Sequence, residues 1–319
     1  MKYKKIRPRN GDTYIYLTGG LGNQLFQYAA ALSVDPSYVK VLTSKSNLKN
    51  DINNIPDLFH FNLPVETFKI KKIRQSKFTR KYLGFLLRLN LVCKVNCILK
   101  LAELFGIIVL YVSTGRVFHL KVCKGIGFSG YPKKYFFPTF LVGYFQSEKY
   151  FNLSTVIDKM RNIVPLIDQE TIEKYRQKSR VDKPLIVHVR LTDYRAEDNF
   201  GILTPDYYSR ALKVMADRVQ FKKIWIFSDE PDEALSYIPV MYHSNCEIIP
   251  LHNKSACVNL EVMRFGVGYI IANSSFSWWA ASLSQMTQPV VVYPDPWFKN
   301  LGTPNCLAPN HWIKVKGHV

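Results

Sequence analysis

The feature that most constrains the fold is a regular alternation of short apolar runs with helix-forming segments in the C-terminal half. We expect strands at 184–190, 223–227, 246–249, 269–272 and 290–293. Buried strands separated by helices are typical of a parallel sheet, because parallel neighbours need a long crossover connection. The sequence therefore predicts an α/β fold with a doubly wound sheet, whose ligand binds beyond the carboxyl ends of the strands.

The N-terminal half begins with the same kind of unit. A strand at 13–17 runs into a glycine turn at 18–24 and then a helix from Leu25, and a further strand follows at 39–42. Glycines let a ligand approach the backbone closely, so the turn faces a nucleotide or sugar, or it is simply a tight turn in which Asn23 caps the helix. With 319 residues, the chain is long enough for two domains, which we place at 1–155 and 156–319.

The charge of the chain is concentrated in its first half. Residues 1–150 hold 24 Lys and Arg against 7 Asp and Glu, whereas 151–319 hold 19 against 17. No acidic residue lies between Glu66 and Glu103, where ten basic residues alternate mainly with aliphatic ones. This pattern predicts a contact with an anionic membrane surface or a lipid-phosphate-linked substrate, or else a solvated basic helix face. The aliphatic interleaving and the absence of a recognised motif argue against nucleic acid.

Other features point to a cytoplasmic protein. Charges at Arg88, Lys94, Lys100 and Glu103 interrupt the apolar residues too often to predict a membrane-spanning helix. No apolar segment of a signal peptide follows the basic residues 1–10. The six cysteines show no zinc-binding spacing, and we expect reduced, mostly buried thiols.

The strand at 184–190 carries a candidate anion site at its end. His188 and Arg190 are two residues apart, so their side chains point to the same face of the strand. Asp193 and Tyr194 follow in the loop where this fold binds ligands. His188 alone would suit a hydrogen-bonded core histidine, but Arg190 favours a diphosphate, because guanidinium pairs with phosphate oxygens.

Two more strand ends carry polar groups. Asp229 offers a free carboxylate, which either accepts hydrogen bonds from a base edge such as that of guanine or caps the following helix. Ser274 and Ser275 lie between an apolar strand and a helix, whose first amides favour a phosphate; the alternative is a capped helix with Trp278 and Trp279 in a core. Together the three strand ends predict a nucleoside-diphosphate pocket.

Five segments resemble motifs of a known family, the α-1,2-fucosyltransferases of glycosyltransferase family 11. In chain order they are GGLGNQLFQYA at 19–29, GYFQSEKYF at 143–151, HVRLTDY at 188–194, FSDE at 227–230 and NSSFSWWA at 273–280. The resemblance implies a GT-B fold, with two Rossmann-like domains facing across a cleft. It also implies that the C-terminal domain binds GDP-fucose, that the N-terminal domain binds most of the acceptor, and that no metal is needed.

The resemblance also implies roles for individual residues. The reaction would be an inverting transfer of L-fucose to the 2-hydroxyl of a galactoside. Arg190 and His188 would be catalytic residues at the diphosphate. The base is our own hypothesis: Asp193 is the first candidate and third catalytic residue, with Glu148 and Asp12 behind it. The donor-binding residues would be Arg190 and His188 at the diphosphate, Asp229 at the guanine, Ser274 and Ser275 at the phosphates, their neighbours Asn273 and Phe276, and Gly20, Gly22 and Asn23 across the cleft.

The sequence departs from the family pattern at several positions. Leu191 and Thr192 stand where the family usually has Arg and Gly, Glu230 where a second Asp is common, and Asn259 where Asp is frequent. The alternatives are therefore a transferase of the same fold with another sugar nucleotide, or a non-catalytic basic protein that binds membranes or nucleic acid. A basic acceptor half would suit assembly of a lipid-linked surface polysaccharide, such as O-antigen or capsule, at the inner face of a bacterial membrane.

Overall fold

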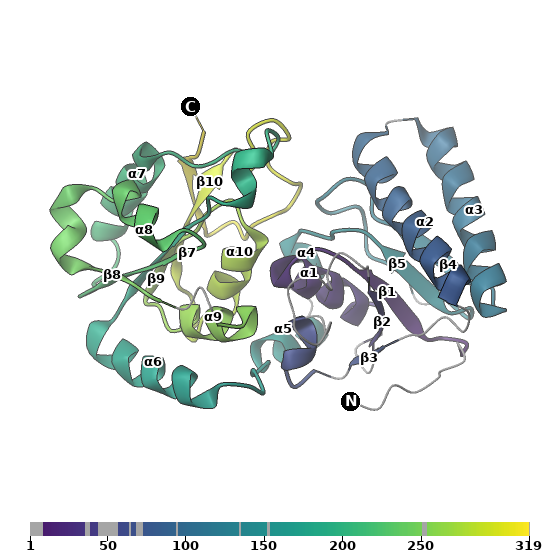
Figure 1. Cartoon of the computed structure of the whole chain (residues 1–319), viewed down its shortest axis with the longest axis horizontal. Coiled ribbons are helices and arrows are strands. Elements are labelled where there is room, and N and C mark those ends of the chain that lie inside the picture. The colour runs from purple at the N-terminus through teal and green to yellow at the C-terminus, as the bar shows by residue number, and fades with distance from the viewer. Residues whose placement is uncertain are drawn as a thin grey trace. The chain divides into compact units, whose positions relative to one another are not determined.

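The computed structural model describes residues 9–35, 39–43, 57–63, 65–67, 73–93, 95–133, 135–151, 154–250 and 254–318. They form two compact units (Figure 1). The first unit comprises the chain up to Ile163 together with Asn305–Leu307, and the second comprises Val164–Pro304 and the chain from Ala308 onward. A hydrogen bond of 2.7 Å from the Ser147 hydroxyl to the Cys306 carbonyl holds Asn305–Leu307 in the first unit. The division thus falls eight residues after the predicted boundary at 155. Both units have a parallel sheet between helices, which confirms the α/β class.

The first unit is built on a five-stranded sheet in the order β3-β2-β1-β5-β4, and all neighbouring strands are parallel. The central strand is buried at every position, which explains why it reads as a nearly continuous apolar run. The strands are β1 (Thr13–Leu17), β2 (Val39–Thr43), β3 (Val65–Thr67), β4 (His119–Val122) and β5 (Thr139–Val142).

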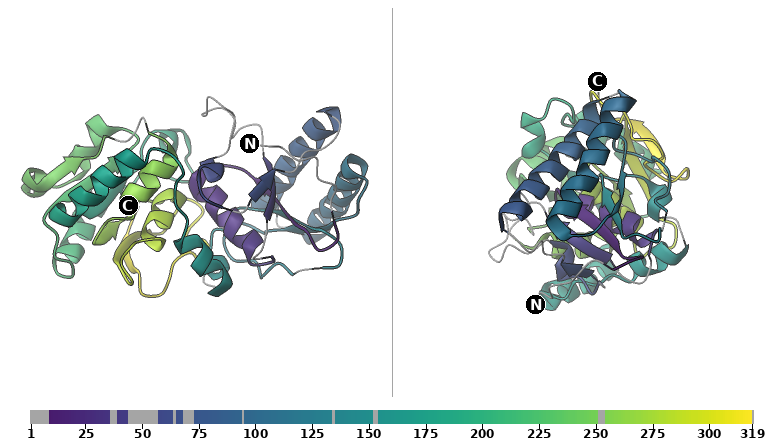
Figure 2. Two further views of the ribbon diagram at one scale, coloured as in Figure 1. Left: turned by 90° about the horizontal axis from the view of Figure 1, so that it is seen from below. Right: turned by 90° about the vertical axis from the view of Figure 1, so that its right-hand side faces the viewer.

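Helices cover both faces of this sheet. One face contacts α1 (Leu21–Leu32), which also contacts η2 (Asp57–His60), α4 (Glu148–Phe151) and α5 (Ser154–Arg161). The other face packs against the hairpin of α2 (Ile73–Val92) and α3 (Asn96–Thr114), seen side by side in the right view of Figure 2. Successive strand residues point to opposite faces, so Tyr14 and Tyr16 of β1 pack on the hairpin.

The glycine turn after β1 places the start of α1. Gly19 has φ of +77°, and a Cβ there would lie 2.5 Å from the Asn23 side-chain nitrogen. Gly20 occupies the N-cap position with no side-chain cap, and Asn23 lies inside the helix, where its Oδ1 accepts a hydrogen bond from Gln146 at 2.7 Å. The alternative in which Asn23 caps this helix is therefore wrong.

The second unit has a six-stranded parallel sheet in the order β11-β10-β9-β6-β7-β8. Its strands are β6 (Leu185–Val189), β7 (Ile224–Ser228), β8 (Cys246–Ile248), β9 (Gly268–Ile270), β10 (Val290–Asp295) and β11 (Ile313–Lys316). The five strands expected from the sequence are present, and β11 adds an edge. The switch in strand order lies between β6 and β9, where a doubly wound sheet binds its ligand.

The helices of the second unit bury the sheet on both sides. They are α6 (Gln169–Asp182), α7 (Pro205–Ala216), α8 (Pro231–Ala234), α9 (Ala256–Met263) and α10 (Ser275–Ser282), with short turns η3 (Asp193–Ala196), η4 (Leu235–Tyr237) and η5 (Val240–Asn245). Thr204 is the N-cap residue of α7, but its side chain makes no cap hydrogen bond. Trp278 and Trp279 of α10 are fully buried, so the tryptophans do fill a core.

Two sequence expectations need correction. Helix α3 begins after Lys94 and continues past Glu103 through an apolar segment, so by length and composition alone it could cross a membrane, with mean hydropathy 1.9. The sequence prediction treats the basic residues of α2 and the first turns of α3 as one segment, whereas they belong to two helices. The six cysteines are free, as expected, but only Cys123 and Cys257 are buried.

Candidate active site

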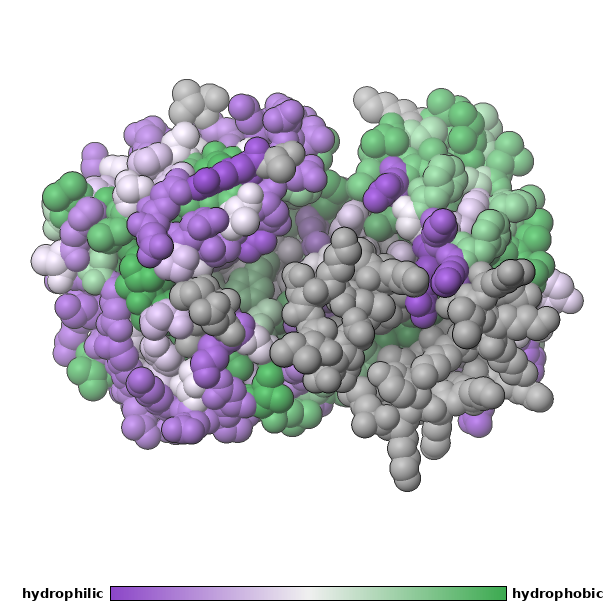
Figure 3. Space-filling view, viewed as in Figure 1, coloured by the Kyte–Doolittle hydropathy of each residue, from purple (hydrophilic) through white to green (hydrophobic). Residues whose placement is uncertain are grey.

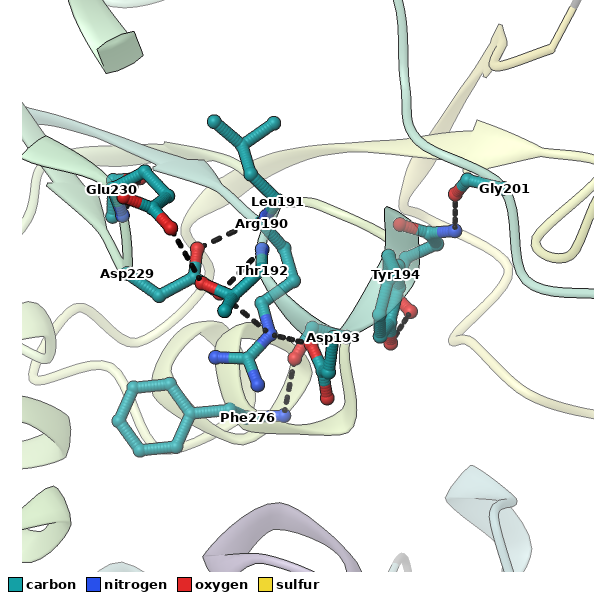
Figure 4. A network of polar contacts seen from close by, with 12 residues as sticks. Arg190, Leu191, Thr192, Asp193, Tyr194, Gly201, Asp229, Glu230 and Phe276 are labelled. Carbon is teal, nitrogen blue, oxygen red and sulfur yellow. Dashed lines mark hydrogen bonds and ion pairs between the residues drawn. The ribbon is translucent and has the colours of Figure 1, made fainter. Parts of the chain in front are cut away.

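Arg190 leaves the carboxyl end of β6 and is held through one of its three nitrogens. Its Nε donates to Oδ1 of Asp193 at 2.9 Å and lies 3.4 Å from Oδ2 of Asp229 (Figure 4). The guanidinium carbon lies 5.9 Å from the centre of the Tyr194 ring. Neither terminal nitrogen bonds to a described residue. The arginine is therefore fixed in position with its fork of donors still available to an anion.

Asp229, at the end of the adjacent strand β7, binds the loop that follows Arg190. Its two carboxylate oxygens accept from the backbone N–H groups of Leu191 and Thr192, both at 3.0 Å (Figure 4). Burial alone would raise the pKa of Asp229, but Arg190 and these amides outweigh it and lower the pKa below its usual value. The expectation of a free carboxylate was wrong, since both oxygens are engaged within the protein.

His188 lies inside β6, where only 5% of its surface is exposed. Its Nδ1 has no hydrogen-bond partner among the described residues, and its ring centre lies 6.1 Å from that of Phe276. Burial, and then the positive charge of Arg190, lower the pKa of His188 to about 4. The imidazole is therefore neutral at neutral pH and can offer one donor or one acceptor beside the arginine.

The buried histidine predicts a loss of stability in mild acid. The pKa of His188 is about 4 in the folded chain and about 6.5 in the unfolded one. As the pH falls below 6.5, His188 therefore binds a proton in the unfolded chain but not in the folded chain. Between pH 6.5 and 4 this group should remove about 3 kcal/mol of folding free energy. Urea denaturation across this range should show a shallower loss for His188→Gln than for wild type. A control variant at the exposed His311, His311→Gln, should keep the wild-type slope.

The first turn of α10 lies beyond the end of β9, the neighbour of β6 in the sheet. Ser274 is its N-cap residue, and its hydroxyl accepts from the amide of Phe276 at 3.3 Å, which confirms the predicted cap. Ser275 and Phe276 are half-buried in this turn. A helix N-terminus carries partial positive charge, so the turn supplements Arg190 with backbone donors.

Asn273 joins neighbouring segments of the site through hydrogen bonds. It is 1% exposed, and its side-chain nitrogen donates to the carbonyls of Phe200 and Gly201 at 3.1 and 2.9 Å. Its own carbonyl accepts from the Tyr194 hydroxyl at 2.8 Å. The side chain predicted to contact the donor therefore joins the 200–201 loop to the strand end. The sequence does not predict the hydrogen bond from Tyr194 to Asn273 or the contact of its ring with Arg190, although Tyr194 belongs to the HVRLTDY motif at 188–194.

The remaining candidates for donor binding and for the base lie in the first unit. Gly20 is exposed and a Cβ there would meet nothing within 4 Å, whereas Gly22 is buried inside α1. Asp12, a lesser candidate for the base, forms an ion pair with Lys40 at 2.5 Å, and Glu148 begins α4. Among the described residues, no group of three or more His, Cys, Asp and Glu side chains is arranged to hold a metal ion.

The two units define a class of protein. The chain is similar to the solved structure of the fucosyltransferase NodZ from Bradyrhizobium, with TM-score 0.50 and 13% identity over 89% of this chain and 94% of that one. The fold is thus the GT-B fold of sugar-nucleotide transferases, as expected. Residues 119–299, more than half of the chain, match the model of glycosyl transferase family 11. The chain belongs to this family and is a glycosyltransferase.

Two curated relatives from Escherichia coli cover nearly the whole chain. An alpha-1,2-colitosyltransferase is 24% identical over 94% of this chain and 97% of its own length. The O-antigen biosynthesis glycosyltransferase WbnK is 27% identical over 95% of this chain and 100% of its own length.

Proposed function

We propose that the protein transfers L-fucose from GDP-fucose to the 2-hydroxyl of a galactoside in a surface glycan, with inversion at the sugar carbon. The observation that carries the proposal is the pairing of two anion-binding elements at adjacent strand ends. Arg190 follows β6 with two terminal nitrogens that bond to no residue in the described part of the chain, and the capped first turn of α10 follows β9. Both would stabilise the negative charge that grows on the departing diphosphate.

The remaining steps use groups at the same strand ends. The acceptor oxygen forms the new bond to the sugar carbon while the bond from that carbon to the diphosphate breaks, and the acceptor proton goes to a base. Asp193 is our candidate for this base. One of its carboxylate oxygens pairs with Arg190, which places Asp193 at the site, and the Asp193 side chain is 57% exposed. Neutral His188 would bond to the diphosphate or acceptor, and Asp229 would act on the donor by positioning Arg190. The proposal requires no metal, because Arg190 and the helix amides supply the positive charge.

The relatives support the linkage and the setting, and they add one further donor. The name of one specifies an alpha-1,2 transfer and that of the other places it in O-antigen biosynthesis. Because the first is a colitosyltransferase, a colitose nucleotide is our second candidate donor. Leu191 is buried and the Thr192 amide is bound to Asp229, so neither residue replaces the missing family guanidinium.

A panel of sugar nucleotides tests the proposal. We expect GDP-fucose to give the highest kcat/KM for GDP release with a terminal galactoside acceptor, and EDTA to leave the rate unchanged. The product should carry fucose in an α-1,2 linkage by NMR. Preference for GDP-colitose would select the second candidate. Turnover with uridine nucleotides but no guanosine nucleotide would refute both.

A further inference from the structure

Helix α3 is apolar on two opposite faces, but only one of them is covered by the protein. Its inner face is buried at Leu99, Val109 and Leu110, and Leu110 belongs to the core cluster that the helices form with the sheet. Its outer face exposes a row of large apolar side chains, each between 47 and 67% exposed. They are Ile98, Leu101, Leu104, Phe105, Ile108, Tyr111 and Val112. A helix that is apolar on opposite faces is normally buried on both, and exposed apolar patches of this kind mark interaction sites.

Helix α2 extends the apolar surface and adds charge at its edge. Phe78, Phe85 and Val92 recur at seven-residue intervals, so they share one outer face, and they are 55, 51 and 78% exposed. The Tyr82 ring lies 5.8 Å from Phe85 and 5.1 Å from Phe105, so this stripe continues into the outer face of α3. Figure 3 shows hydrophobic residues gathered over α2 and α3, with hydrophilic ones along α2.

A basic stripe runs along α2 beside the apolar one. Lys77, Lys81 and Arg88 are exposed and share a helix face about 60° from the phenylalanines at 100° per residue. Lys100 and Lys124 are exposed on and near α3, and α2 contains no acidic residue. An apolar surface edged by cations fits the boundary between acyl chains and anionic headgroups.

The packing of α3 fixes how it would meet a membrane. Gly106 lies against the sheet, since a Cβ there would be 2.8 Å from Leu120 and 3.0 Å from Leu86. The Ser113 hydroxyl is hydrogen-bonded to Thr79 of α2 at 2.5 Å, and both residues are buried. Crossing a bilayer would strip α3 from α2 and expose the core beneath them. The helix can therefore lie in the interface while it remains docked on the sheet.

We propose that the outer face of the α2–α3 hairpin is a peripheral docking surface for an anionic lipid bilayer. The apolar stripe inserts among the acyl chains, and Lys77, Lys81 and Arg88 pair with lipid phosphates. The stripe of basic residues favours lipid over a second copy of this chain, because a self-complementary interface would bring the same cations together. The inference does not depend on which sugar is transferred, since these residues lie in the first unit and the donor candidates Arg190 and Asp229 in the second.

Vesicle flotation of the full chain tests the inference. We expect wild type to bind vesicles of phosphatidylglycerol and phosphatidylethanolamine much better than phosphatidylcholine alone. Replacing Lys77, Lys81 and Arg88 together with glutamine should weaken binding to the anionic vesicles on the order of 100-fold, about fivefold per residue. Leu101→Glu with Ile108→Glu should reduce binding by at least about 10-fold, because two charges would enter the acyl region.

Matched variants separate surface effects from folding. Val240 and Met241 of the second unit are 80 and 78% exposed, so Val240→Glu with Met241→Glu adds the same charge at an equally exposed apolar site. This control should bind vesicles like wild type, and all variants should keep the wild-type melting temperature by circular dichroism. Equal binding to neutral and anionic vesicles would overturn the inference. So would a wild-type dimer, seen by light scattering, that Leu101→Glu and Ile108→Glu dissociate without any vesicle binding.

Discussion

Replacing Arg190 with alanine is expected to lower kcat by at least about 100-fold, the scale of losing one preorganised donor to developing charge. The guanidinium is anchored through Nε, and its terminal nitrogens bond to no described residue. The side chain is 32% exposed, so its removal opens no core cavity. The loss should therefore appear in turnover with GDP-fucose. The melting temperature should fall only modestly, because Asp229 keeps its bonds to the amides of Leu191 and Thr192.

Two variants make this expectation specific. Arg190→Lys keeps the charge but loses the fork and Nε, so we expect intermediate activity. Arg195, five residues on, is exposed and pairs with Glu233 rather than with the strand-end carboxylates. Arg195→Ala should retain near-wild-type kcat. If Arg190→Ala turned over as fast as Arg195→Ala, Arg190 would have no part in the chemistry.

Local patterns made much of the fold predictable from the sequence. The strands of the second unit are short apolar runs bounded by polar or glycine residues, a signal that needs no knowledge of distant contacts. The cap at Ser274 was also predictable, because a side chain bonds to an amide two residues away. Strand alternation likewise placed His188 and Arg190 together, since both face the same side.

Contacts between distant segments were not predictable in the same way. The carboxylate of Asp229 bonds to amides 37 and 38 residues earlier, a relation that no periodicity encodes. A short sequence window shows that α3 is apolar but not which face the sheet covers. The prediction of a free carboxylate failed because it considered the strand end alone. In the folded chain Asp229 bonds to the end of the adjacent strand, whereas the terminal nitrogens of Arg190 bond to no described residue.

Asp229 provides the second large effect, and it should act through Arg190. Asp229→Ala leaves the amides of Leu191 and Thr192 without their acceptor and frees Arg190 from one of its two carboxylates. With the side chain 17% exposed, we expect a loss of about 2 kcal/mol in the free energy of urea unfolding. Because the pKa of Asp229 is lower in the folded than in the unfolded chain, the carboxylate stabilises the fold at a pH above its unfolded-state pKa. This stabilisation disappears as the pH falls through the folded-state pKa. Asp229→Ala should therefore lack this part of the loss of stability in acid.

The activity of Asp229→Ala shows whether the two residues act as a unit. We expect kcat to fall nearly as far as in Arg190→Ala, and the double variant to be little worse than either single one, since both remove the same positioned guanidinium. Asp229→Asn keeps one acceptor oxygen and should lie between alanine and wild type. Asp232 is exposed in the following helix α8, so Asp232→Ala should change unfolding by no more than about 0.5 kcal/mol. Fully additive losses in the double variant would instead mean that Asp229 meets the donor directly, as the sequence resemblance implies for guanine.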